Sequence, residues 1–288
     1  PNTPYIEANA FDEGTWYEHT LYGNITLYGG KYNMLTDTAT GWIETQITIA
    51  DGYEKKFNGD RTVSIVKSPV AQIGSTKYDT LEEALKKAKS GDTIKLLQNV
   101  ALTDQVIISK NITLNLNDKT ISSKADYAFI VNTGNSFTLE NGTLSASKNG
   151  VFGFKGSTIT LASDAKITAA GAGILATNSK ADEGNATINV YGTIHSQDIA
   201  VWSQGPKNTI NIDSATITSN YFGVYQNGSY GGTTITIKDS SITDSFADGA
   251  GVYVANNGTN AADPDQGLQK LTIENSKITG STAVEVKC

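Results

Sequence analysis

Residues 209–226 read TINIDSATITSNYFGVYQ and contain three short apolar segments separated by polar turns. The first segment is Ile210-Asn-Ile212, the second is centred on Ile217, and the third contains Val224. Apolar residues at alternate positions are typical of a β-strand with one buried face. Asp, Ser and Asn stand between the segments and favour tight turns. The stretch therefore predicts three short strands joined by two turns.

The same pattern recurs along the chain. The apolar triplets that open each unit start at intervals of 23, 22, 29, 22, 25 and 36 residues. The first residues of these triplets are Leu114, Phe137, Ile159, Ile188, Ile210, Ile235 and Leu271. A second apolar anchor follows in each unit, at Ile121, Leu144, Ile167, Ile194, Ile217, Ile242 and Ile278. The spacing predicts a structural repeat of about 22 residues with insertions.

Three short strands per repeat predict an all-β parallel solenoid of about 7 to 8 coils. One coil cannot bury its own inward side chains, so neighbouring coils stack about 4.8 Å apart and share one Val/Ile/Leu core. Insertions must then leave at the turns, and residues 177–185 and 255–269 have the polar composition of such insertions.

The solenoid needs a cover at its open end, and residues 79–91, DTLEEALKKAKSG, predict a capping helix. Thr80 and Glu83 have the spacing of a capping box, and Gly91 supplies the stop. One apolar stripe runs along this helix, formed by Leu81, Ala84, Leu85 and Ala88.

Residues 70–100, VAQIGSTKYDTLEEALKKAKSGDTIKLLQNV, and 107–121, IISKNITLNLNDKTI, carry a family resemblance. Together they resemble the opening of a right-handed parallel β-helix module of the pectate-lyase-like superfamily. The resemblance covers residues 70–288. It implies a secreted or surface-displayed protein of the kind built from tandem modules in large surface proteins of Gram-positive anaerobes. It does not by itself imply catalysis.

Residues 1–69 form the second predicted part of the chain. Residues 25–67 are similar to the segment that closes one such module before the next begins, with a Gly-Gly pair, ADGY and a final pair of short strands. We therefore expect the small β segment 1–69 to be the closing part of a preceding module. A separate small β domain or an assembly arm is the alternative.

Composition and charge exclude several classes of protein. The chain has 22 Lys plus Arg against 29 Asp plus Glu, a net charge of −7, which argues against a nucleic-acid partner. No run of about 20 apolar residues predicts a membrane span. A single cysteine, Cys288, excludes an internal disulfide and a Cys-based zinc site. Cys288 is either a residue without a role or a link between chains, and no cofactor is predicted.

The pectate-lyase-like superfamily includes enzymes, so the chain must be compared with their catalytic residues. In pectate lyases an Arg removes the proton beside a calcium-bound uronate, and the only Arg here, Arg61, lies outside the solenoid. The polygalacturonases use several carboxylates with His and Arg, whereas Asp239, Asp244 and Asp248 have no such partners nearby in the sequence. Asp239 also falls in a turn equivalent to those of Asn141, Asp213 and Asn275, which indicates turn chemistry. We therefore predict no enzyme and no catalytic residue.

The remaining polar candidates carry no motif. His195 follows the inward Ile194 and is expected to point outward, and His19 lies in an aromatic stretch. The loop around Asn260, Asp263 and Asp265 is rich in oxygen ligands but lacks EF-hand spacing, so a solvated loop is favoured over a calcium site. No metal site is predicted.

The third strand of each repeat suggests a surface. Its expected core residues are Val151, Ile174, Val201, Val224, Val252 and Val284, so the next residue in each strand should face outward. These outward residues are Phe152, Leu175, Trp202, Tyr225, Tyr253 and Glu285, and two positions further on come Phe154, Thr177, Gln204, Asn227, Ala255 and Lys287. We predict a carbohydrate-binding stripe, because aromatic rings beside amides suit sugar rings. Its members are Phe152, Trp202, Gln204, Tyr225, Asn227 and Tyr253. Cross-coil stacking of purely structural importance is the alternative.

These observations predict a non-catalytic extracellular adhesin module on a bacterial cell surface or appendage. Its partner is expected to be a glycan or a host surface protein. The alternatives are a structural spacer or a fibre subunit of a cell-surface or phage appendage, with tandem modules or head-to-tail self-association. A polysaccharide lyase or hydrolase ranks last, because its catalytic motifs are absent.

Overall fold

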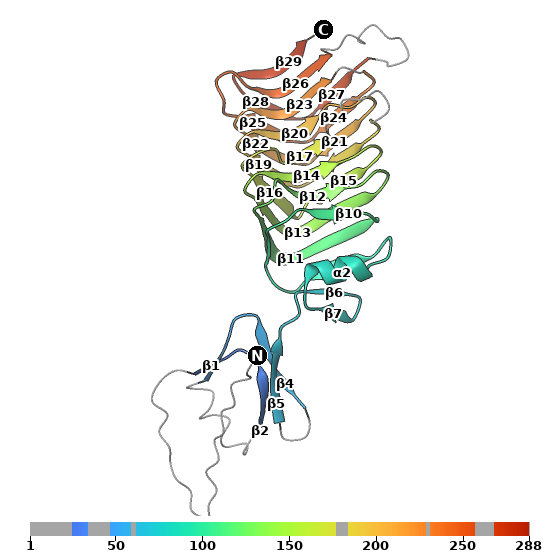
Figure 1. Ribbon diagram of the computed structural model, residues 1–288. Helices are drawn as coiled ribbons and strands as arrows, with labels where there is room; N and C mark the ends of the chain where they lie inside the picture. The colour runs from blue at the N-terminus through green and yellow to red at the C-terminus, as the bar shows by residue number, and fades with distance from the viewer. Residues whose placement is uncertain are drawn as a thin grey trace, which may run out of the picture. The chain divides into compact units, whose positions relative to one another are not determined.

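The computed structural model describes residues 25–33, 47–58, 62–176, 184–228, 231–256 and 268–287. The chain divides into two compact units, residues 1–69 and 70–288. The larger unit is a parallel β-solenoid of about eight turns, which confirms the predicted fold class (Figure 1).

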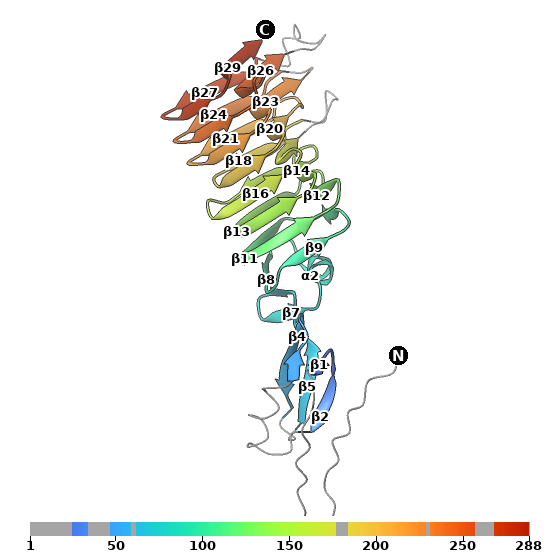
Figure 2. The ribbon, with the colours of Figure 1, turned by 90° about the vertical axis from the view of Figure 1, so that its left-hand side faces the viewer.

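Each coil of the solenoid contributes strands at three successive positions (Figures 1 and 2). The first-position strands are β8 (Thr93–Leu96), β11 (Ile112–Ser123), β13 (Ser136–Ala146), β15 (Thr158–Leu161), β18 (Thr187–Val190), β21 (Thr209–Asp213), β24 (Thr234–Lys238) and β27 (Lys270–Glu274). The long strands β11 and β13 run on into the second position. The other second-position strands are β9 (Val100–Leu102), β16 (Ala165–Ala169), β19 (Thr193–Ser196), β22 (Thr216–Ser219), β25 (Ser241–Asp244) and β28 (Lys277–Thr279).

The third-position strands form an eight-stranded parallel sheet of their own. In the order in which they pair, they are β10 (Val106–Ile108), β12 (Tyr127–Val131), β14 (Asn149–Gly153), β17 (Ile174–Ala176), β20 (Ile199–Ser203), β23 (Phe222–Gly228), β26 (Ala250–Asn256) and β29 (Thr282–Lys287). This sheet is called the third sheet below, because it carries the candidate site.

Equivalent residues of successive coils stack in register, as the repeat requires. Ile210 pairs with Ile188 on one side and with Ile235 on the other. The predicted second-strand anchors are buried in one continuous core, as seen at Ile121, Leu144, Ile167, Ile194, Ile217 and Ile242. Val284 differs, with 37% of its surface exposed. It lies in β29, the last strand of the third sheet among the described residues, so no further coil packs against it.

The predicted helix forms as α2 (Leu81–Lys87), the one helix in the described part of the chain. The Glu83 amide donates to Thr80 Oγ1 at 3.1 Å, which closes the first turn. Leu81 and Ala84 are buried against the solenoid core. The helix is shorter than the predicted range 79–91, because Ala88 leaves helical geometry with ψ at 145°. That α2 caps the solenoid stays a prediction.

Two further strands precede α2 in the chain. The antiparallel hairpin of β6 (Ala71–Ile73) and β7 (Thr76–Tyr78) pairs through β6 with β8. In the described ranges, no helix has the length and apolarity needed to cross a membrane.

The described residues of the smaller unit, residues 1–69, form two small sheets. Strand β1 (Ile25–Leu27) pairs in parallel with β3 (Ile47–Ile49), and Ile25 lies opposite Ile47, 22 positions later. This separation equals the coil repeat of the solenoid. The antiparallel sheet has the order β2 (Gly30–Asn33), β5 (Thr62–Lys67), β4 (Tyr53–Phe57). The parallel pair favours the reading of residues 1–69 as the end of another solenoid, which stays a prediction.

Candidate functional site: the outer surface of the third sheet

The candidate stripe lies on the outer surface of the third sheet, which is the side away from the core. Register places Phe152, Leu175 and Trp202 opposite one another in β14, β17 and β20. Trp202 is followed in turn by Tyr225 in β23 and Tyr253 in β26. Because side chains alternate across a strand, these residues point away from the core that Val201 and Val224 enter. The structure thus brings the predicted aromatic residues into one row.

An outer apolar cluster, distinct from the solenoid core, contains this row. Its buried members are Ala172, Leu175, Ile199, Phe222, Ala250, Tyr253 and Ala255, and Tyr127, Phe152, Trp202 and Tyr225 pack against them. A solenoid sheet normally turns polar side chains to water, so a second apolar layer on the outside is unusual for a solvated face. The outer apolar cluster therefore sets this surface apart as the candidate site.

Strict alternation predicts that Phe222 points inward with Val224, but Phe222 belongs to the outer apolar cluster. The reason is Gly223 between them. A Cβ on Gly223 would lie 2.3 Å from Cγ2 of the core residue Ile242, so this position also faces inward and alternation breaks there. Small residues occupy the same position in every coil from β12 on, at Ala128, Gly150, Gly173, Ala200, Gly223, Gly251 and Ala283. This small-residue column, which directly precedes the inward residue of each third-sheet strand, is the sequence signal that could have predicted the outward direction of Phe222 and Ile199.

The rings of the outer apolar cluster contact one another across coils. Tyr225 and Tyr253 stack with centroids 4.9 Å apart, and Trp202 meets Tyr225 edge-on at 6.1 Å. Phe222 lies 4.6 Å from Tyr225, and Phe152 packs on Tyr127 further along the row. Tyr253 is only 6% exposed, whereas Phe152, Trp202 and Tyr225 are half-buried and reachable. The accessible part of the row is therefore centred on Trp202 and Tyr225.

Polar groups adjoin these two rings. Gln204 and Asn227 are both half-buried, two positions beyond Trp202 and Tyr225. Asn227 Nδ2 donates to the Tyr225 hydroxyl, which holds that ring in place. Of the flanking positions, Ala255 is buried, Phe154 is exposed, and Thr177 lies outside the described residues.

Two polar groups at the row have no protein partner among the residues that the structure describes. The Gln204 side-chain amide forms no hydrogen bond within the described part of the chain. Trp202 Nε1 is buried and has no acceptor. Buried N–H groups nearly always have a partner, so this indole nitrogen is an exception among the buried polar atoms described.

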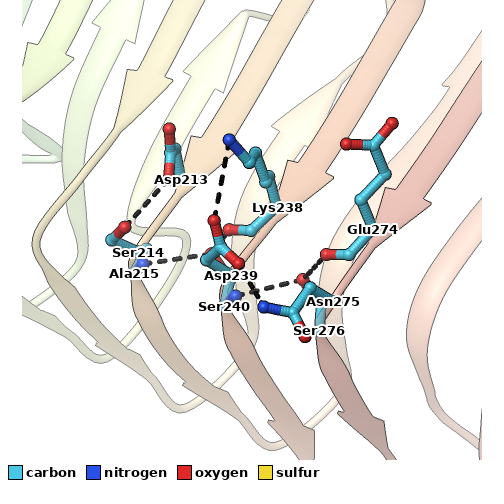
Figure 3. A network of polar contacts seen from close by, with 9 residues as sticks. All are labelled: Asp213, Ser214, Ala215, Lys238, Asp239, Ser240, Glu274, Asn275 and Ser276. Atoms are coloured by element: carbon cyan, nitrogen blue, oxygen red, sulfur yellow. Dashed lines mark hydrogen bonds and ion pairs between the residues drawn. The ribbon is translucent and has the colours of Figure 1, made fainter.

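The predicted carboxylate candidates do not converge. Asp239 lies at a corner between strands with φ of 48°, where Asn275 Nδ2 donates to it and Lys238 Nζ lies 3.7 Å away (Figure 3). Asn275, with φ of 45°, repeats this geometry in the next coil. Asp213 does not, because it pairs in register with Lys238 and the corner residue of its coil is Ser214. Asp239 is therefore one of a series of turn residues that repeats from coil to coil at this corner.

Asp244 stands at the other end of β25 from this corner and is 4% exposed. Ser219 Oγ donates to Asp244 Oδ1 at 2.9 Å, and the Phe246 amide donates to Oδ2 at 3.2 Å. Burial raises the pKa of Asp244 above its usual range, although these hydrogen bonds partly oppose the shift. Asp248 is exposed in the following turn.

The other polar candidates form no centre among the residues described. His195 is exposed, and its Nδ1 lies 2.6 Å from Thr218 Oγ1 on the neighbouring coil. No group of three His, Cys, Asp or Glu in the described ranges could hold a metal ion. Several predicted positions fall outside those ranges, namely His19, Arg61, Asn260, Asp263, Asp265 and Cys288.

Two hollows of about 550 and 320 Å³ lie at the α2 end of the solenoid, around Leu102 and Thr103. Neither contains a residue of the aromatic row. No family model matches the chain, and neither a curated protein nor a solved structure is found to be similar to it.

Proposed function

We propose that this chain is a non-catalytic extracellular module that binds a glycan along the outer surface of the third sheet. The observation that carries the proposal is the pairing of Trp202 and Tyr225. Their half-buried rings stand on adjacent coils, with the amides of Gln204 and Asn227 two positions further along their strands. Sugar rings offer apolar C–H faces and hydroxyl rims, so they need this combination of rings and amides.

The spacing of the coils supports the same proposal. Adjacent parallel strands lie about 4.8 Å apart, which is close to the length of one sugar unit in an extended polysaccharide. A rigid solenoid can therefore offer rings on adjacent coils, such as Trp202 and Tyr225, to successive sugar units, without the cost of ordering a loop. An adhesin on a bacterial surface or appendage would use such a pre-formed surface. A Cys-poor, Thr-rich composition is compatible with that location.

A glycan array and polysaccharide pull-down test this function. The wild-type chain is compared with the double variant Trp202→Ala, Tyr225→Ala, after circular dichroism has shown that the variant keeps its β-sheet spectrum. Tyr191→Ala is the matched control, because Tyr191 is 38% exposed and follows β18, away from the third sheet. We expect binding by the wild type and the control, and loss of binding by the double variant. Absence of binding by the wild type, or undiminished binding by the double variant, would contradict the proposal.

A structural spacer is the second candidate, and the burial of Tyr253 favours it. Tyr253 and Tyr225 cover each other, so part of the outer apolar cluster stabilises the stack of coils without any ligand. In that case the solenoid supplies length, and a fibre would require self-association. Sedimentation velocity over a hundredfold range of concentration separates the two forms, because a fibre subunit grows in size with concentration and a spacer does not.

A further inference from the structure

We infer that the ligand is an electrically neutral polysaccharide that runs along the solenoid axis; this inference rests on the proposed function. The outward positions of β12, β14, β17, β20, β23 and β26 carry no charged side chain among the residues described. These positions hold Tyr127, Ile130, Asn132, Asn149, Phe152, Phe154, Ala172, Leu175, Ile199, Trp202, Gln204, Phe222, Tyr225, Asn227, Ala250, Tyr253 and Ala255.

The absence of charge matters because acidic sugars need cationic partners. Carboxylate and sulfate groups are recognised by Arg and Lys, and Arg is preferred because its planar fork matches these anions. Residues 70–288 contain no Arg. The net charge of −7 further repels a polyanion.

Charged side chains stand at the margins of the surface, and five of them, Asp126, Lys148, Asp198, Glu285 and Lys287, are ion-paired or acidic. Asp126 and Lys148 form an ion pair beside β12 and β14. In β29, Lys287 Nζ lies 2.9 Å from Glu285 and 5.2 Å from the centre of the Tyr253 ring. Asp198, just before β20, is partly buried, and burial raises the pKa of its carboxyl. None of these groups offers an unpaired cation to an anionic chain.

The direction of the ligand follows from the register of the rings. Phe152, Trp202, Tyr225 and Tyr253 occupy the same position in their strands, so the row runs from coil to coil, across the strands. A polysaccharide lying along the row meets the rings of Phe152, Trp202 and Tyr225 in turn, with the buried Leu175 between the first two. A chain lying parallel to one strand would meet a single aromatic residue of the row and leave the others unused.

Isothermal titration with defined polymers tests the charge of the ligand. The probes are soluble β-glucan, mannan and chitin oligosaccharides on the neutral side, and polygalacturonate and heparin on the anionic side. We expect a neutral probe to bind with a Kd that changes less than about twofold between roughly 0.05 and 0.5 M salt, because no ion pairs are screened. Trp202→Ala with Tyr225→Ala should weaken this binding by about tenfold or more, whereas Tyr191→Ala should leave it unchanged.

The outcomes separate the inference from the proposed function. Suppose that only polygalacturonate or heparin binds, that this binding weakens as salt is added, and that it is lost without Trp202 and Tyr225. The surface then binds glycans, but the neutral-ligand inference is wrong. If no probe binds the wild-type chain, the inference and the proposed function both fail.

A length series tests the direction. Oligomers of the best neutral probe should gain affinity up to about five sugar units, the number of coils from β14 to β26. Phe152→Ala should weaken binding of a hexamer and spare that of a dimer, because Phe152 lies two coils from Trp202. Equal effects of Phe152→Ala on both lengths, or no effect on either, would overturn the axial direction.

Discussion

Tyr225 and Tyr253 stack on the outer surface of the third sheet with ring centroids 4.9 Å apart and an angle of 16° between their planes. They occupy the same position in adjacent coils, so the coil repeat itself sets their separation. The Tyr225 ring is half-buried and reachable, whereas the Tyr253 ring is buried. The outer apolar cluster can therefore stabilise the solenoid at Tyr253 while it displays a binding surface at Tyr225.

The contact between these tyrosines should be measurable as a coupling energy. In a double-mutant cycle of Tyr225→Ala and Tyr253→Ala, we expect the free energies of unfolding to be non-additive by about 0.5 to 1.5 kcal/mol, the usual value of an aromatic pair. Urea unfolding followed by circular dichroism gives the four values. Tyr127→Ala with Tyr253→Ala is the control pair, because these rings do not touch and their effects should add. A coupling near zero for Tyr225 and Tyr253 would show that the stack contributes only buried area.

Gln226 should be a destabilising residue in the core. It is fully buried next to Ser203, and neither the nitrogen nor the oxygen of its amide has a hydrogen-bond partner in the described part of the chain. A buried amide without partners costs about 1 to 3 kcal/mol, so Gln226→Met, which keeps the shape of the side chain, should raise the free energy of unfolding by about that amount. Gln204→Met, at a half-buried outward position, should produce no such gain. A loss of stability in Gln226→Met would indicate that bound water satisfies the amide.

Asp244 should make stability depend on pH. Burial raises its pKa in the folded state above the value of 3.8 for an exposed Asp, so the folded chain holds the proton more tightly than the unfolded chain. The stability that Asp244 contributes is thus fully present below pH 3.8 and is lost as the pH rises through the raised pKa. We expect Asp244→Asn to be more stable than the wild type at pH 7, and the difference to shrink as the pH approaches 4.

Urea midpoints of both chains across this pH range measure the effect. In the Asp244→Asn variant the new side-chain amide can accept from the Phe246 amide and donate to Ser219, so both contacts are kept. The comparison also removes the contribution of Asp198, whose pKa is likewise raised and which is present in both chains. A difference in stability that is constant with pH would contradict the assignment to Asp244.

The small-residue column should be intolerant of added atoms. A Cβ on Gly223 would meet Ile242 Cγ2 at 2.3 Å and the carbonyl oxygen of Gly251 at 2.4 Å, so Gly223→Ala should cost about 1 to 3 kcal/mol. Gly228→Ala in the same strand is the control, because its nearest neighbour is the Gln204 carbonyl oxygen at 3.0 Å and a smaller loss is expected. Chemical unfolding of both variants gives the comparison. If both variants lose the same free energy of unfolding, the inward direction of Gly223 does not explain the destabilisation by Gly223→Ala.

Much of the fold could be predicted from the residues alone. The 22-residue spacing of triplets such as Ile188-Asn-Val190 and Ile210-Asn-Ile212 reflects in-register stacking, and the apolar residues of those triplets are buried opposite one another. Alternation also placed Trp202 and Tyr225 outside and Val201 and Val224 inside. These features are local, since a strand turns successive side chains to opposite faces whatever surrounds it.

The departures have non-local causes. Phe222 lies outside because Gly223 packs against Ile242, a contact between different strands that alternation cannot express. Helix α2 ends at Lys87, before the predicted stop at Gly91. There the Lys110 ammonium group, from the start of the next coil, donates to the carbonyl oxygen of Ala88 at 2.6 Å.

The solenoid, its repeat and most of the core positions follow from the order of the residues, because burial follows from periodicity and a repeated unit must stack on its neighbours. How far each outward ring is covered depends on packing between coils. Trp202, Tyr225 and Tyr253 have equivalent positions in the repeat, yet Tyr253 alone is almost fully buried. Exposure depends on the neighbours that a side chain meets in adjacent coils, and those neighbours lie 20 to 30 residues away in the chain.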